Sequence, residues 1–336
     1  MSDIKHEVAI HDLKRSKKDT DKRYREILRA LSAKERELVS ALHIKDGVNP
    51  VTIASKRKRG NSQATVFVIM SDWHMEETVK RVSVNGLNAF NLRIAEERAM
   101  AVFRNCVRLA EIVQKDIAVD KMVLALIGDF ISGNIHEELL ENCSLSPIDA
   151  TIFAQGIIAG GIKHILEKTK LDIEVITAAG NHARITKQTH FSTENGNSLE
   201  YMMYHSLALH FAREKRVRFH ISQGYHSFVC CYGRNIRFHH GHAVKYGGGI
   251  GGLTIPANKA IAQWNKGMPK KLVADLDVFG HFHTFIDAGS FICNGSLIGY
   301  NAFAKAIKAS YEEPCQAFFV IDRDRGKTFV CPILTW

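Results

Sequence analysis

The residues that could do chemistry in this chain are Asp, Asn and His side chains that directly follow short apolar runs. Five such groups occur along the sequence, namely Asp72 with His74, Asp129, Asn181 with His182, His240, and His281 with His283. A strand that buries apolar residues and then presents these groups places potential ligands at one edge of a sheet. Carboxylate, amide and imidazole groups gathered in this way are typical of a site for divalent metal ions.

The spacing within two of these groups has a physical reason. Residues i and i+2 of an extended backbone point to the same side, so we expect Asp72 and His74 to bind one ion together. By the same reasoning, His281 and His283 can serve one cluster of ligands. A glycine precedes three of the candidate ligands, where it permits a tight turn and a close approach of the backbone.

The ligand types also limit which ions could bind. Asp129 has two carboxylate oxygens and can bridge two cations that lie about 3.5–4 Å apart. A mixed set of His and carboxylate ligands suits Mn, Fe, Zn or Ni better than Mg or Ca, which prefer oxygen alone. We therefore expect a centre of two divalent metal ions, with manganese as the first choice.

The elements that must position these residues alternate between strands and helices. The pattern predicts strands at 65–70, 121–128 and 173–180, and helices at 92–115, 148–168 and 197–213. From residue 217 onward short strand patterns dominate, with one helical stretch at 255–265. This order predicts a layered α/β domain, with two sheets packed together as a β-sandwich and helices outside.

The first 62 residues differ from the rest in composition, so we predict an N-terminal appendage and linker over 1–62 and one large domain over 63–336. Residues 20–43 have helical spacing, and the basic run 56–59 lies in a segment typical of a linker. Residues 1–60 contain 16 Lys/Arg and 9 Asp/Glu, which accounts for most of the net charge of +10. This balance favours an arm that binds a polyanion such as nucleic acid, or else a solvated helix that binds nothing.

The composition excludes several other classes of protein. The chain has 336 residues, 46% of them hydrophobic, which is enough for a full core. No apolar run reaches the roughly 18–20 residues that span a bilayer, and the N-terminus has no apolar stretch like that of a signal peptide, so we expect a cytoplasmic protein. Seven cysteines without a CxxC pair argue against a zinc knuckle and against a disulfide framework.

The ordered blocks D-x-H, G-D, G-N-H, H-G-H and G-H-x-H, spread over residues 72–283, resemble the calcineurin-like metallophosphoesterase superfamily. That superfamily includes nuclease subunits of double-strand-break repair complexes, cyclic-nucleotide phosphodiesterases and Ser/Thr phosphatases. The segments SDWHMEE, FHHGHAVKYGGG and NGSLIGYNAFA also resemble a group of phage-encoded phosphoesterases. The resemblance implies a metallophosphoesterase-like fold and hydrolysis of phosphoric esters.

The resemblance also implies a role for each residue. The first ion would be bound by Asp72, His74 and His283, the second by Asn181, His240 and His281, and both by Asp129. A metal-activated hydroxide would attack phosphorus, and His182 would act as the general acid that protonates the leaving oxygen.

One departure from the family pattern concerns the residues after G-N-H. Many members have an acid there that orients the histidine, whereas this chain has Ala183 followed by Arg184. Another acid could orient His182, the candidates being Glu76, Glu77, Glu137 and Glu138, or the histidine could work without one. Arg184 could hold a phosphate oxygen bidentately, or it could be an ordinary arginine of a surface loop.

Three further residues near the motifs have two interpretations each. His239 and His242 flank the candidate ligand His240. Either could help to orient His240 next to the metal, or have no role. Trp73 lies inside the first motif, where it could pack against the ligands or stack on a base.

These observations predict a phosphodiesterase that acts on nucleic acid and is therefore a nuclease. Two alternatives stay open. One is a phosphatase or phosphodiesterase for small nucleotides or phosphoproteins, and the other is an inactive binding or scaffold subunit with the same fold.

Overall fold

The computed structural model of the chain describes residues 49–55, 62–246, 248 and 251–336, together with the isolated helical positions Lys18, Lys22 and Glu26. The predicted helix at 20–43 and the basic run 56–59 therefore lie almost entirely outside the described residues. The chain divides into two units, Met1–Val48 and Asn49–Trp336, and the second unit contains all the elements below.

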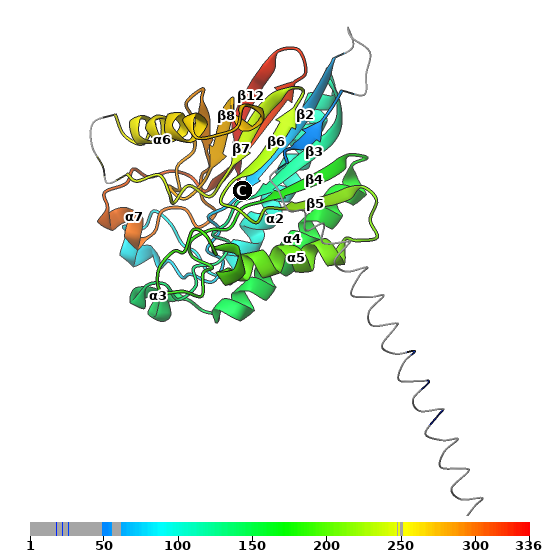
Figure 1. Cartoon of the computed structure of the whole chain (residues 1–336). Coiled ribbons are helices and arrows are strands. Elements are labelled where there is room, and N and C mark those ends of the chain that lie inside the picture. Colours follow the sequence, from blue (N-terminus) through cyan, green and yellow to red (C-terminus); the bar gives the residue numbers. More distant parts are fainter. Residues whose placement is uncertain are drawn as a thin grey trace, which may run out of the picture. The chain divides into compact units, whose positions relative to one another are not determined.

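Two six-stranded sheets form the centre of this unit (Figure 1). Sheet A has the order β1 (Val51–Ile53), β6 (Ser227–Cys231), β7 (Arg234–Phe238), β8 (Leu276–Phe279), β10 (Phe291–Cys293) and β9 (Ile286–Asp287). Sheet B has the order β12 (Gly326–Leu334), β11 (Cys315–Asp322), β2 (Gln63–Met70), β3 (Ala118–Leu126), β4 (Asp172–Thr177) and β5 (Val217–Ile221).

Helices cover the outer face of each sheet. The long helices are α2 (Leu92–Gln114), α4 (Pro147–Lys168), α5 (Leu199–His210) and α6 (Thr254–Lys266), and the short ones are α3 (Glu137–Asn142) and α7 (Ala302–Ala306). Three of the long helices begin at a side-chain cap, because Asn91, Ser146 and Ser198 each accept a hydrogen bond from a backbone N–H of the first turn. No described helix has the length and apolar character needed to cross a membrane.

Alternation along β2 explains how the layers pack. Val66 and Val68 belong to the core beneath α2, α4 and α5, whereas Phe67 and Ile69 belong to the core between the two sheets. A third core, which includes Ile261, lies between sheet A and α6. Because both faces of the central strands are buried, they read as continuous apolar runs rather than as alternating ones. The predicted fold class, two packed sheets flanked by helices, is confirmed.

The topology places the candidate site. In sheet B, β2, β3 and β4 are parallel neighbours, so the segments that follow them, near residues 72, 129 and 181, leave from one edge of the sheet. In sheet A, β7 and β8 are also parallel, and they lead to residues 240 and 281. Ligands in α/β sheets bind beyond the carboxyl ends of the strands, and all five motifs begin there.

One strand was not predicted. Residues 51–53, which we assigned to the linker, form β1 and pair in parallel with β6 at the edge of sheet A. Ile53 is buried in the core between the sheets. A three-residue apolar run is too short to be recognised as a strand, because its identity depends on the neighbour it pairs with.

Candidate metal centre

The backbone at the candidate ligands adopts the left-handed conformation that side chains usually avoid. Positive φ angles occur at Asp72 (57°), His74 (49°), Asp129 (55°), His281 (70°) and His283 (54°). The left-handed conformation costs energy in non-glycine residues, so it occurs mainly where the surrounding structure enforces it, often at functional sites. The predicted reason for their alignment, an extended backbone with alternating side chains, is therefore wrong, although the side chains do come together.

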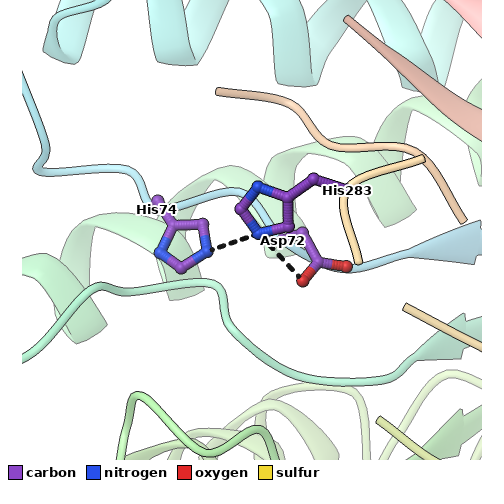
Figure 2. A group of neighbouring side chains, drawn as sticks. All are labelled: Asp72, His74 and His283. Atoms are coloured by element: carbon purple, nitrogen blue, oxygen red, sulfur yellow. Dashed lines mark hydrogen bonds and ion pairs between the residues drawn. The ribbon is translucent and has the colours of Figure 1, made fainter. Parts of the chain in front are cut away.

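The first ligand group consists of Asp72, His74 and His283, whose ligand atoms all lie within 4.8 Å of one another. Figure 2 shows the three side chains turned toward a common point. The Nε2 atoms of His74 and His283 are 3.2 Å apart, and His283 Nε2 is 3.4 Å from Asp72 Oδ1. Two ring nitrogens and a carboxylate oxygen at this spacing are suited to surround one cation.

The second ligand group consists of Asp129, His240 and His281, again within 4.8 Å. His240 Nδ1 donates a hydrogen bond of 2.8 Å to the backbone carbonyl of Ile127, so in the neutral ring the lone pair is on Nε2. That Nε2 faces Asp129 Oδ2 at 2.8 Å. A lone pair and a carboxylate oxygen at this distance require a positive charge between them, supplied by a proton or by a metal ion.

The electrostatics of His240 and Asp129 agree with this geometry. Burial lowers the pKa of His240, but the Asp129 carboxylate more than offsets this and raises the pKa to about 10. Burial also raises the pKa of Asp129, but His240 and His182 hold it well below its usual range. In His74 and His281, burial and neighbouring histidines lower the pKa well below the usual value, so both rings are neutral, which is the form that binds metals.

A third set of ligand atoms, from His74, Asp129 and His182, joins the two groups. Asn181 lies beside them, because the next residue, His182, donates its backbone N–H to Asp129 Oδ1 at 2.8 Å. Asn181 Oδ1 is buried and has no hydrogen-bond partner among the described residues. Since buried polar atoms are almost always paired, this orphaned oxygen fits a metal ligand. The donor set as a whole therefore fits two divalent cations.

The close approach of the two loops that bear Asp129 and Asn181 depends on glycine. A Cβ on Gly180 would collide with the Asp129 side chain and backbone, and a Cβ on Gly128 would collide with Gly180. Gly128 also has a φ of +95°, a conformation that favours glycine. The glycines of G-D and G-N-H thus let two ligands meet, as the motif spacing predicts.

His182 is oriented by a backbone carbonyl rather than by a carboxylate. Its Nδ1 donates to the carbonyl oxygen of Ser132 at 2.8 Å. The Ser132 segment is in turn fixed by Glu76, whose Oε1 accepts the backbone N–H groups of Ser132 at 2.8 Å and Gly133 at 2.9 Å. Of the four acids that we considered, Glu76 thus supports His182, but only through the backbone.

Position 183 could not hold an acid of the kind that the metallophosphoesterase pattern places there. Ala183 is buried in a small apolar cluster with Ile131 and Ala150. A carboxylate there would be desolvated among apolar groups, at a considerable free-energy cost. The chain therefore has no acid at position 183, and the Ser132 carbonyl orients His182 in its place.

Arg184 contacts the loop that bears Asn181. Its Nη1 donates a hydrogen bond of 2.5 Å to the Asn181 backbone carbonyl. Burial lowers the pKa of Arg184 from its ordinary value, partly offset by the Asp129 charge. The guanidinium therefore fixes the loop around a candidate ligand, and a direct contact with phosphate stays a prediction.

The histidines that flank His240 do not orient it, since the Ile127 carbonyl does. His239 Nε2 lies 3.4 Å from Asp277, which also pairs bidentately with the buried Arg237. His242 Nε2 lies 2.9 Å from Glu194 Oε1 at the side of the second ligand group.

Trp73 is a packing residue. It is fully buried, its ring packs edge-on against Phe130, and its Nε1 donates to Gln316. A ring in this position has no face left for a base, so the stacking interpretation is wrong.

Two buried side chains of the site were not predicted at all. Glu200 accepts hydrogen bonds from the backbone N–H groups of Phe130 and Gly180, next to two candidate ligands. Ser71 donates to Asp72 Oδ2 and accepts from Asn294. No motif spacing marks either residue, because each acts through the partner that the fold brings to it.

No protein-family model and no curated protein matches the chain. Among solved structures, it is similar to a dimetal phosphatase from Danio rerio, with 9% sequence identity, a TM-score of 0.37, and coverage of 81% of this chain and 99% of that chain. The chain itself has two packed sheets flanked by helices, with paired His/Asp groups beyond the carboxyl ends of their strands, as the motifs predict.

Proposed function

We propose that this protein is a phosphoesterase that depends on two divalent metal ions and hydrolyses phosphodiester bonds, with nucleic acid as its substrate. The observation that supports it best is the pair of ligand groups joined through Asp129. When bound, two cations in such groups lower the pKa of water and neutralise the oxygens of a phosphate. All seven predicted ligands are retained in these loops, which argues against an inactive scaffold.

His182 is the residue that we propose for proton transfer to the leaving oxygen. Its ring has a fixed orientation, because Nδ1 is held by the Ser132 carbonyl, and this leaves Nε2 for the substrate. Burial lowers the pKa of His182, although Asp129 partly offsets this, so the ring is neutral near pH 7 in the protein without substrate. The negative charge of a bound phosphate would raise that pKa and let the ring take up the proton it later donates.

A substrate panel tests the proposed reaction. Protein treated with a chelator and then supplied with Mn²⁺ should cleave bis-p-nitrophenyl phosphate faster than p-nitrophenyl phosphate, and it should degrade single- or double-stranded DNA. Preference for the monoester, without DNA degradation, would favour a phosphatase. Bound metal without turnover of any ester would support the scaffold alternative.

The proposal of a nucleic-acid substrate depends on the basic N-terminal region. Its charge comes from two parts, residues 1–48 and the run Lys56-Arg57-Lys58-Arg59, so each needs its own variant. Deleting 1–48 keeps β1 in place, and replacing the four basic residues by Gln changes charge alone.

If the region binds the DNA backbone, both variants should weaken DNA binding and flatten its salt dependence. Hydrolysis of bis-p-nitrophenyl phosphate should stay unchanged. An unaltered salt dependence of DNA binding in both variants would refute the proposal that this region binds DNA.

A further inference from the structure

Glu200 is a fully buried acidic side chain; burial and the Asp129 charge raise its pKa to about 8, although two backbone N–H groups that it bonds favour the ionised form. It lies in the first turn of α5, which begins at the Ser198 cap, and none of its surface is exposed. Buried acids are rare unless their oxygens are bonded, and both oxygens of Glu200 are. Oε1 accepts from the backbone N–H of Phe130 at 2.7 Å, and Oε2 accepts from that of Gly180 at 2.9 Å.

Each of these two N–H groups belongs to a residue next to a candidate metal ligand. Phe130 directly follows the candidate bridging ligand Asp129, and Gly180 directly precedes the candidate ligand Asn181. One carboxylate thus joins the loop after β3 to the loop after β4, at the point where the absence of a Cβ lets the loops touch. Without an acceptor, two N–H groups would be buried unpaired, and each such group is costly.

We propose that Glu200 is a positioning residue that sets the separation between Asp129 and Asn181 and so assembles the second metal position. This inference rests on the proposed metal centre. A carboxylate is required because it offers two acceptor oxygens in a fixed fork, one for each loop. Removing a group that holds a metal ligand in position by hydrogen bonds typically weakens metal binding by about 10–100-fold. We expect a loss of that size for the second ion.

The Glu200→Gln variant tests this directly, because it keeps the shape and changes only the bonding. The Gln amide has one acceptor oxygen and one NH₂ group, so one of the two backbone N–H groups would face a donor. We expect the second Mn²⁺ to bind about 10–100-fold more weakly in calorimetry, while the first changes little. In electron paramagnetic resonance, the spectrum of a coupled Mn²⁺ pair should give way to that of an isolated Mn²⁺.

Matched controls separate positioning from general stability. Glu174→Gln alters another buried glutamate, but its partners are the side chains of Lys121, Arg218 and His220 rather than the ligand loops. Tyr204→Phe removes a hydrogen bond from the same helix to the Ala178 carbonyl and leaves both N–H groups paired. Both controls should keep the coupled Mn²⁺ pair, whatever they do to the melting temperature.

The outcomes distinguish this inference from the proposed function. If the wild-type protein binds no pair of ions, the metal centre itself is refuted. If it does, and Glu200→Gln binds two ions with unchanged affinities, Glu200 is structural only and the inference is overturned. Should Glu200→Gln fail to fold, Glu200→Asp serves instead, because it keeps the carboxyl group with its two oxygens but is one methylene shorter. It should bind the second ion more weakly than wild type, and an unchanged affinity would overturn the inference.

Discussion

The two ligand groups are enclosed alike but differ in the groups that hold their ligands. Each has two buried side chains and one partly exposed histidine, His283 in the first group and His281 in the second. In the second group, His240 donates to the backbone carbonyl of Ile127, and Glu200 joins the two loops through backbone N–H groups. In the first group, the His74 ring bonds the rotatable hydroxyl of Ser132. Because backbone groups fix a ligand more firmly than a rotatable hydroxyl does, we expect the second ion to bind more tightly than the first.

The largest effect should come from Asp129→Asn, since Asp129 joins the two groups. The change removes the negative charge opposite His240 and leaves a poor ligand for either ion. We expect both ions to bind weakly and hydrolysis of bis-p-nitrophenyl phosphate to become undetectable. Metal analysis after gel filtration, with turnover measured on the same sample, checks this. Retention of one tightly bound ion would show that the groups are independent.

His182→Ala should separate turnover from metal binding. General acid catalysis contributes about 10²–10⁴-fold, so kcat should fall within that range while both ions stay bound. Rates on an ester with a good leaving group should fall less, because such a group needs no proton. An equal loss on good and poor leaving groups would contradict the role of a proton donor.

Substitutions of His240, which is completely buried, and His283, which is 27% exposed, test how far the burial of a ligand decides its contribution to stability. His240→Ala leaves the Asp129 carboxylate buried without its partner, and breaking a buried pair costs about 3–5 kcal/mol. His283→Ala lies at a partly exposed position and should cost less. Chemical unfolding in the presence of a chelator measures both values. Equal losses of stability would show that the burial of the ligand does not decide its contribution.

The smallest effect concerns Glu174, which lies in β4 away from the ligands. Burial raises the pKa of Glu174, but His220 and Lys121 more than offset this and lower it to about 2. A carboxyl with a lowered pKa stabilises the fold above its unfolded value near pH 4.5, and this stabilisation is lost as the pH falls toward 2. Allowing for solvent screening, Glu174→Gln should cost about 2 kcal/mol at pH 7 and almost nothing near pH 2. Urea unfolding at several pH values measures this, and a loss independent of pH would contradict it.

Much of the fold could be predicted because the central strands bury both faces. The segments around residues 65–70, 121–128 and 173–180 are largely apolar without strict alternation, and each proved to contain a strand of sheet B. The candidate ligands could be found because they follow those strands directly. These signals are local in the sequence, so no knowledge of packing was needed.

Other features depend on contacts between distant segments and leave no local signal. The left-handed backbone at Asp72 and His74 arises where this segment pairs with the loop after β3. The Ser132 carbonyl that orients His182 is a backbone group, which no residue type reveals. Glu200 reads as an ordinary acid in the first turn of a helix, and its partners become visible only when α5 packs beside the two loops.

The short strand β1 also determines where the protein can be shortened for production. A protein that began at residue 62 would lack Val51–Ile53 and would expose the backbone N–H and C=O groups of β6. An unprotected strand of this kind is a template for pairing with other molecules and so promotes aggregation. A truncated form that begins at Asn49 keeps β6 paired with β1. It is therefore the better starting point for purification and crystallisation.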